Sequence, residues 1–514
     1  NKSLGTNGSV NAGYNIGTFP KYNGGFTLNH RNKNTNIFGN YNYNDAKNIT
    51  DLSIIRTVAD SLFENKGNMT MTNKSHNFKA GVDYFINKLS TVGVVVNGSL
   101  SEGTISNYSR TPISYQPTKT VDRILVADNR SSVSRDNVNV NANYSYTNPN
   151  GKSLTLNADY GDYDNYTDQL QPNTYFDARG ENVTSRVVYQ FVAPSKIKIT
   201  SGKADWEQNF AKGKLGFGGK TAFIKSDNDF QRYNVFTSGK ELDKDRSNQF
   251  LYKENINALY VNYNRQYKGI NLQAGLRMEH TNTDGTSTGL KKSNGNYTPY
   301  DSTFTRSYTD FFPSAAITFN KNPMSQWNFT YSMRIDRPVY QDLNPFEFKL
   351  DEYTFQKGNI NLRPQYTNSF GLTHTYKYRL NTKINYSHVK DMFVQWIDTA
   401  EGSKSFITKR NLATQDIVSL NISYPFQYKS YSMFANMNTN VSHYTANFED
   451  RKVDLNAFGF SFFTQNSLKF AKTFTAELTG FYNAPTLFQG SFRSKTLWSV
   501  DAGLQKQIMK GNAT

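Results

Sequence analysis

The chain has 514 residues, a hydrophobic content of 37% and a mean hydropathy of −0.68, values that alone are typical of a water-soluble protein. No segment approaches the roughly 20 consecutive apolar residues that a membrane-spanning helix needs, which excludes a helical membrane protein. The formal net charge is +17, and the absence of cysteine excludes disulfides, a thiol nucleophile and thiolate metal ligands.

The positive charge shows no pattern that indicates nucleic acid. Lysine and arginine are scattered among Asn, Ser and Thr, and no nucleic-acid recognition motif is present. An anionic membrane surface or an anionic ligand is compatible with such a charge. Aromatic residues make up 15% of the chain, and their amphipathic rings suit membrane–water interfaces. We therefore expect no nucleic-acid partner.

The sequence shows no domain boundary. No linker, no Pro/Ser-rich tract and no shift in composition divides it, although a soluble chain of this length usually forms several domains. No signal peptide is recognisable at Asn1, and Leu4 already belongs to an alternating stretch. We predict a single domain over residues 1–514 and expect residue 1 to be an interior point of a longer gene product.

In chain order, the first half consists of stretches in which apolar and polar residues alternate, which is the period of a β-strand. The clearest stretch places Val138, Val140, Ala142, Tyr144 and Tyr146 on one face, with Asn and Ser between them. The other strands predicted in this half lie near residues 4–16, 26–30, 37–43, 78–86, 92–100, 154–160, 197–208 and 215–223.

Two local features of this half predict backbone geometry. The segment Asn148-Pro149-Asn150-Gly151 is typical of a hairpin turn, because Asn and Gly accept positive φ angles. The strand near 197–208 loses its alternation between Ile199 and Ala204, which predicts a β-bulge there.

The second half continues the same alternation. From residue 327 to 336 it has no fault, and Trp327, Phe329, Tyr331, Met333 and Ile335 share one face. The other strands predicted in this half lie near residues 256–263, 270–278, 311–319, 370–376, 380–386, 418–424, 431–437, 453–463, 474–478 and 498–504.

The connections between predicted strands also alternate in length. Those after even-numbered strands are short, such as Asn87-Lys88 and Tyr378-Arg379, whereas most of those after odd-numbered strands are long. A soluble β-sandwich gives no reason for this pattern, but outer-membrane barrels have short periplasmic turns and long outer loops. We therefore predict an all-β fold, a transmembrane antiparallel up-and-down β-barrel with about 20 strands in this sequence.

Four motifs follow one another in the second half. They are Phe311-Phe312-Pro313-Ser314, residues 331–338, Leu343-Asn344-Pro345-Phe346, and Gly358-Asn359 followed by Leu362 and Pro364. In this order they resemble the barrel of TonB-dependent receptors, in the form common among outer-membrane β-barrel proteins of Bacteroidota. Ile360 and Gln365 depart from the family's usual residues, which affects loop detail only. Residues 4–14, 258–263 and 272–280 look similar to further strands of the family.

The resemblance implies a barrel closed by 22 strands around an N-terminal plug that carries a TonB-contacting segment. Neither the plug nor the last two strands is recognisable in these residues, so we expect a barrel fragment of a longer protein. The resemblance also implies a place in the cell outer membrane and uptake of a ligand of the glycan, peptide or siderophore class. Expected partners are outer-membrane lipid and lipopolysaccharide, TonB through the plug, and a surface lipoprotein. The alternatives are a non-transporting barrel subunit of a larger outer-membrane assembly, and an outer-membrane enzyme or passive pore.

The inner face and the long loop after residue 336 carry the candidate ligand-binding residues. Five charged residues could bind an anionic or sugar ligand there. Alternatively, they could pair with one another or hold the plug. They are Arg277, Glu279, Arg334, Asp336 and Arg337. Loop aromatics could stack on a ligand or pack the loop against its neighbours: Tyr340, Phe346 and Tyr353.

No pattern of residues indicates catalysis or a cofactor. The six histidines are dispersed without metal-ligand spacing, and ordinary strand positions explain them better. The cluster Gly216-Phe217-Gly218-Gly219 lies inside a predicted strand and opens no helix, so it favours close packing over phosphate binding. Acidic pairs such as Asp351-Glu352 have no partner group, and we predict no enzyme activity, cofactor or metal site.

Overall fold

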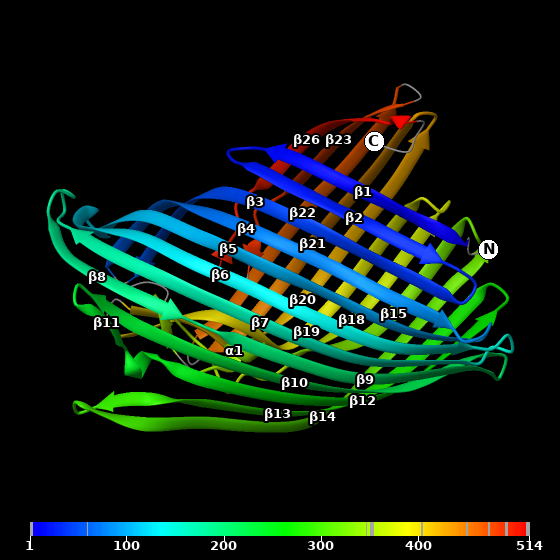
Figure 1. Ribbon diagram of the computed structural model, residues 1–514, viewed down its shortest axis with the longest axis horizontal. Helices are drawn as coiled ribbons and strands as arrows, with labels where there is room; N and C mark the ends of the chain where they lie inside the picture. Colours follow the sequence, from blue (N-terminus) through cyan, green and yellow to red (C-terminus); the bar gives the residue numbers. More distant parts are fainter. Residues whose placement is uncertain are drawn as a thin grey trace.

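A computed structural model describes residues 4–58, 60–345, 347–349, 354–401, 404–448, 451–470, 473–488 and 492–509. Figure 1 shows one large sheet that curves round until its first and last strands approach each other. No helix in this described part of the chain is long and apolar enough to cross a membrane.

In the main sheet each long strand pairs antiparallel with the next long strand of the chain. Of the 26 strands in the described residues, six are short or extend only the end of the barrel with the long connections, which leaves twenty. The six are β8 (Val183–Val192), β11 (Gly239–Leu242), β16 (Glu347–Lys349), β17 (Thr354–Lys357), β24 (Leu487–Phe488) and β25 (Phe492–Arg493). The twenty are β1 (Gly5–Ile16), β2 (Pro20–Arg31), β3 (Thr35–Val58), β4 (Ser61–Phe85), β5 (Ser90–Tyr115), β6 (Thr120–Thr147), β7 (Ser153–Phe176), β9 (Ser195–Phe210), β10 (Gly213–Phe236), β12 (Asn248–Tyr267), β13 (Ile270–Ser293), β14 (Asn296–Asn322), β15 (Ser325–Asp336), β18 (Gln365–Tyr376), β19 (Leu380–Glu401), β20 (Lys404–Tyr428), β21 (Tyr431–Phe448), β22 (Arg451–Lys469), β23 (Phe474–Asn483) and β26 (Leu497–Lys506). Two short helices interrupt the long connections, η1 (Lys244–Arg246) and α1 (Tyr340–Leu343). The predicted all-β antiparallel fold and its number of strands are confirmed.

The two edges of the sheet are formed by its first and last strands. Within the described residues, β1 pairs with β2 alone and β26 with β23 alone. Closure by two further strands around a plug stays a prediction.

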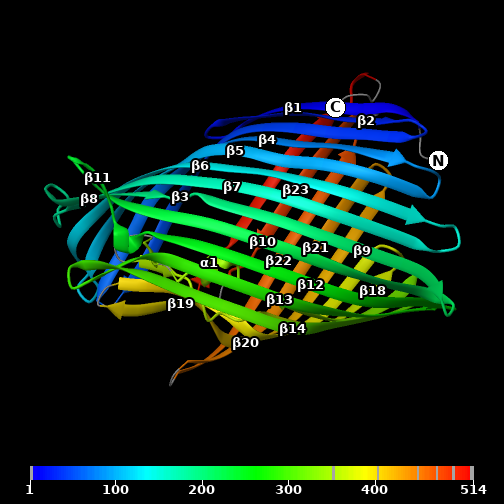
Figure 2. The same ribbon diagram turned by 60° about the horizontal axis from the view of Figure 1, so that its bottom comes forward.

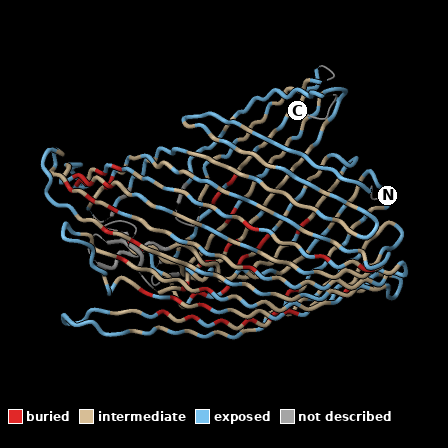
Figure 3. The backbone as a smooth tube through the Cα atoms, in the orientation of Figure 1, coloured by how far each residue is buried: buried red, intermediate tan, exposed pale blue. Residues whose placement is uncertain are grey.

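The apolar face of the sheet points outward. On β12, Leu259 and Val261 are 61% and 45% exposed, whereas the intervening Tyr260 and the preceding Ala258 face the interior. Figure 3 shows that exposed positions recur along nearly every strand and buried ones are few. A soluble sandwich would bury these side chains, so a lipid-facing barrel explains them better.

The outward face is apolar over only part of each strand. On β12 the outward positions change from Val261 and Leu259 to Asn257 and Asn255 with increasing distance from the short turn that follows the strand. A barrel strand needs about 9–11 residues to cross the bilayer, so the segments beyond this apolar band stand outside the membrane.

Several long segments that the sequence analysis treats as loops are extensions of strands. Strands β3 and β4 pair without interruption from Thr35↔Tyr84 to Val58↔Ser61, and β5 with β6 pairs out to Tyr115↔Thr120. Above the apolar band both faces can be polar, so the alternation in sequence fades although backbone pairing continues.

The predicted bulge near Ile199 is wrong. Strand β9 pairs with β7 and with β10 in continuous register through this region. Ile199 faces the interior and Ala204 faces outward, because successive side chains of a regular strand point to opposite faces. The loss of alternation therefore reflects apolar residues on the inner face, not an extra residue.

All the long connections lie at one end of the barrel, while short turns occur at both ends. In Figures 1 and 2 one set of turns lies towards the end where the N-terminus lies, while β8, β11 and the hairpin tip between β13 and β14 project from the other end. The predicted alternation in connection length is therefore only partly right, because much of the sequence assigned to long loops extends the strands instead. The end where the N-terminus lies is expected to face the periplasm, as the short turns of outer-membrane barrels do.

Candidate functional site

The connection between β15 and β18 is residues 337–364, and we call it the inner loop; its described residues, 337–345, 347–349 and 354–364, lie against the inner wall of the barrel. Leu343 of α1 and Leu362 are 2% and 0% exposed, because they pack on Phe250 and Tyr252 of β12. Strand β17 of the same loop pairs in parallel with the start of β20. The inner loop thus contacts two separate parts of the wall, at β12 and at β20.

Three of the predicted charged residues meet at the start of this loop. Arg337 donates hydrogen bonds to the Glu279 carboxylate at 2.8 Å, to Thr281 Oγ1 at 3.0 Å and to the Tyr308 hydroxyl at 3.2 Å. Arg277 Nε donates to the other oxygen of Glu279 at 2.5 Å. The three side chains pair with one another, which is one of the alternatives drawn from the sequence, and their role in ligand binding stays a prediction.

Two further basic residues fix the rest of the inner loop. The Arg306 guanidinium on β14 donates to the backbone carbonyls of Leu362 and Ile360. Lys409 on β20 donates to Asp342 Oδ2 of α1 at 2.8 Å, and that carboxylate side chain is only 9% exposed. The sequence analysis did not single out Arg306 or Lys409. The one signal for Arg306 was its position on the same strand face as Tyr308 and Asp310.

A buried carboxyl lies beside this group. Glu254 of β12 is on the inner face above the apolar band, and burial raises the pKa of its carboxyl, while the positive charge of Arg337 opposes the rise. Glu254 therefore binds a proton more readily than an exposed glutamate does.

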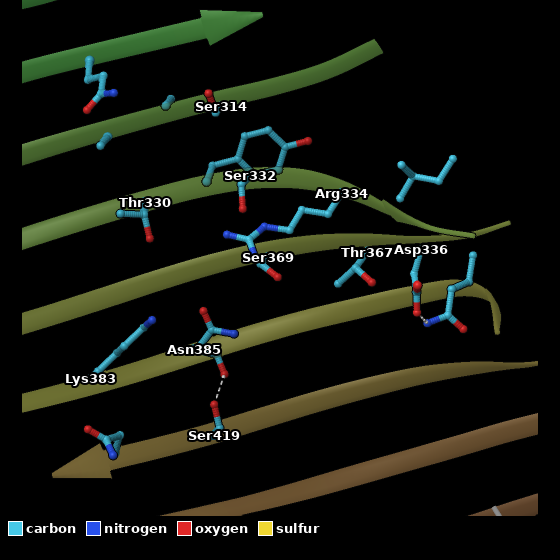
Figure 4. Close-up of a pocket in the computed structure, with 17 residues that line it drawn as sticks. Ser314, Thr330, Ser332, Arg334, Asp336, Thr367, Ser369, Lys383, Asn385 and Ser419 are labelled. Atoms are coloured by element: carbon cyan, nitrogen blue, oxygen red, sulfur yellow. Dashed lines mark hydrogen bonds between the residues drawn. The ribbon is translucent and has the colours of Figure 1, made fainter. Parts of the chain in front are cut away.

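A polar cavity of about 1050 Å³ lies on the inner wall below the loop, and Figure 4 shows its lining. Hydroxyl and amide groups predominate in it, from Ser314, Thr330, Ser332, Thr367, Ser369 and Asn385. Arg334 and Lys383 also line it, and within the described residues neither makes an ion pair. In Figure 4 the Arg334 side chain extends along the wall towards Ser369, while Asp336 accepts a hydrogen bond from Gln365 at 3.2 Å. We call this space the lower cavity.

A second cavity of about 530 Å³ lies beside α1 at the outer end, and we call it the upper cavity. Tyr340 lines it together with Phe230, Phe250, Asp229 and Arg135. The ring of Tyr340 also packs 6.2 Å from that of Tyr252, so it contacts both the wall and the open space. A ligand entering from outside would meet aromatic rings and both signs of charge here.

The other predicted site residues lie in different parts of the structure. Arg334 and Asp336 line the lower cavity, and Tyr340 lines the upper one. Phe346 and Tyr353 lie outside the described residues. In the described part of the chain, no three His, Asp or Glu side chains come together to hold a metal ion.

Residues 145–514 match the model of a family described as the outer membrane protein beta-barrel family. No curated protein matches the chain in sequence. The family match spans most of the chain and includes the whole inner loop and both cavity-lining strands β15 and β18.

Several solved structures are similar to the chain in fold. The siderophore receptor PiuA from Acinetobacter baumannii has a TM-score of 0.65 at 11% identity, over 99% of this chain and 76% of that one. The ferric-catecholate import receptor Fiu from Escherichia coli K12 has a TM-score of 0.63 at 8% identity, over 97% and 75%. The ferric yersiniabactin uptake receptor FyuA from Yersinia pestis has a TM-score of 0.62 at 11% identity, over 100% and 74%. At such low identity these similarities show a shared fold.

Proposed function

The chain belongs to the outer membrane protein β-barrel family, and on this basis we propose that it is the barrel of a TonB-dependent receptor for uptake of a ligand from outside the cell. The solved structures of similar fold are described as uptake or import receptors, which supports transport over a purely structural role. A receptor of this kind requires a plug and a TonB-contacting segment in the same polypeptide. The gene around these residues would reveal both.

The lower cavity is the observation that carries this function. It lies inside the barrel beneath the inner loop, its wall offers many hydroxyl and amide groups, and Arg334 and Lys383 bring two positive charges. Such a surface fits an oxygen-rich ligand with an acidic group, which glycan, peptide and siderophore ligands can each supply. The barrel itself carries out no covalent chemistry in this function.

The experiment is deletion of the gene in its host, followed by complementation with the full-length gene. Cells are grown on single sources of iron, peptide or glycan, with and without a proton uncoupler. We expect deletion to abolish use of one source in an energy-dependent way. The double variant Arg334→Gln with Lys383→Gln should lower that uptake about tenfold, since loss of roughly 1.4 kcal/mol of binding has this effect.

The matched control is Lys225→Gln with Arg186→Gln, which removes one lysine and one arginine from exposed positions away from both cavities. Equal loss of uptake in both variants would remove the lower cavity from the binding site. If deletion leaves every source usable and the protein purifies only with fixed partners, the chain is instead a barrel subunit of a larger outer-membrane assembly.

A further inference from the structure

At the end of the barrel where the N-terminus lies, every connection between the long strands carries a lysine, whereas at the other end short turns such as Asn294-Gly295 between β13 and β14 carry none. There are nine such connections between β2 and β23, and the lysine lies in the turn or directly beside it. All nine lysines are exposed, and we call them the lysine rim: Lys33, Lys88, Lys152, Lys212, Lys268, Lys321, Lys377, Lys429 and Lys469. No aspartate or glutamate occurs in any of these connections.

The fold gathers these lysines although the sequence scatters them. Because the chain passes up and down the barrel, residues about 50 apart in sequence come to the same end (Figure 1). Within the described residues, no lysine of the rim makes an ion pair with another side chain. This end of the barrel therefore carries a ring of exposed lysines whose ammonium groups are available to a partner outside the barrel.

Turn geometry does not explain these lysines. Lys212, Lys377 and Lys429 have φ angles of 63°, 48° and 51°, in the left-handed region. Glycine and asparagine adopt this region at lower cost than lysine does. A sequence chosen only for tight hairpins would have Gly or Asn at these positions.

Aromatic side chains place the rim at the level of the lipid headgroups. Tyr376 and Tyr428 are 42% and 61% exposed, and the ammonium groups of Lys377 and Lys429 lie 5.1 and 5.3 Å from their ring centres. Exposed tyrosine rings at a membrane protein's surface mark the membrane–water interface. An ammonium group next to such a ring lies where phospholipid phosphates lie.

We propose that the lysine rim binds the phosphate groups of anionic phospholipids in the periplasmic leaflet of the outer membrane. Each basic side chain near an anionic lipid surface strengthens association about fivefold, and several around one rim would hold a shell of such lipids against the barrel. Because this attraction is electrostatic and acts at an exposed surface, it weakens as salt is added. The rim thereby fixes the depth of the barrel in the bilayer from its periplasmic side.

The test measures the lipid shell of the full-length protein in phosphatidylethanolamine vesicles. Spin-labelled phosphatidylglycerol and spin-labelled phosphatidylcholine report how strongly the barrel prefers the anionic lipid. We expect the wild type to prefer phosphatidylglycerol and to lose most of this preference at about 1 M salt. A rim variant with Lys33→Gln, Lys88→Gln, Lys268→Gln and Lys321→Gln should lose at least about threefold of the preference.

The control variant removes four exposed lysines from the opposite end, with Lys66→Gln, Lys119→Gln, Lys244→Gln and Lys291→Gln, and it should behave as the wild type. The heat-dependent mobility of each barrel on a detergent gel verifies that the variants are folded. Absence of a preference in the wild type, or equal loss in both variants, would overturn the assignment. So would a rim variant that keeps its lipid preference but no longer binds isolated peptidoglycan, because the rim would then be a cell-wall contact.

Discussion

Among single residues, Glu254 has the clearest consequence for pH. Burial raises the pKa of its carboxyl, and nearby Arg337 opposes the rise. A carboxyl with a raised pKa in the folded state contributes stability that is fully present below its unfolded pKa and is lost as pH rises through the folded value. We expect Glu254→Gln to raise the urea midpoint of unfolding at neutral pH, and the difference from wild type to vanish below about pH 4.

Exposed Glu102 on β5 provides the matched control for this measurement. Glu102→Gln removes the same charge without a buried carboxyl, so its urea midpoint should follow that of the wild type at both pH values. A lower midpoint for Glu254→Gln at neutral pH would mean that attraction to Arg337 outweighs burial, contrary to the expected sign.

The residues of the candidate site could be predicted by type but not by partner. Arg277, Glu279 and Arg337 are charged residues on a predicted inner face, and they do meet. Arg306 was missed because its acceptors are the carbonyls of Ile360 and Leu362, and any residue supplies a carbonyl. A contact made to the backbone leaves no mark in the sequence of the partner.

At the scale of elements, the ion pair between Arg337 and Glu279 is one of several contacts that hold the inner loop, and it lies at the loop's start. Arg337 is 20% exposed and pairs with Glu279, and it also hydrogen-bonds fully buried Thr281. Arg337→Gln leaves Thr281 without this donor and Glu279 with Arg277 alone, which should cost about 2 kcal/mol. The expected result is faster amide hydrogen exchange in residues 338–345, with the wall strands β12 and β13 unchanged.

Arg363 at the other end of the inner loop gives the comparison. Its side chain is 66% exposed and pairs with Asp391 at 2.9 Å, so Arg363→Gln should cost less than about 1 kcal/mol. If the two substitutions speed exchange in residues 338–345 equally, the loop does not depend on the buried pair.

The strands were predictable only where lipid imposes their pattern. In the apolar band the outward positions are mostly apolar and the inward positions of β15 and β18 mostly polar, so the alternation of these two strands can be read directly. Their pairing follows, with Trp327 opposite His374 and Phe329 opposite Leu372. Beyond the band both faces of the sheet can be in contact with water, so apolar and polar residues no longer alternate. The long extensions of β3 to β6 therefore resemble loops in the sequence. The position of the inner loop depends on packing between β12 and loop residues more than 90 positions away in sequence. The alternation of apolar and polar residues carries no information about such contacts.

At the scale of the whole molecule, the proposed uptake and the proposed lipid contact both depend on which end faces the periplasm. The chain has no cysteine, so a single introduced thiol reports its own side of the membrane. Ser238 lies in the turn between β10 and β11, Ser430 lies in the short turn between β20 and β21, and both are exposed.

A membrane-impermeant maleimide added to intact cells should label Ser238→Cys in the full-length protein within minutes. It should label Ser430→Cys only after the outer membrane is disrupted, because short turns of outer-membrane barrels face the periplasm. The two variants make the same Ser→Cys change in exposed turns, so different reactivity reflects access alone. Labelling of Ser430→Cys in intact cells would reverse the barrel, place the lysine rim outside the cell and make the inner loop a periplasmic feature.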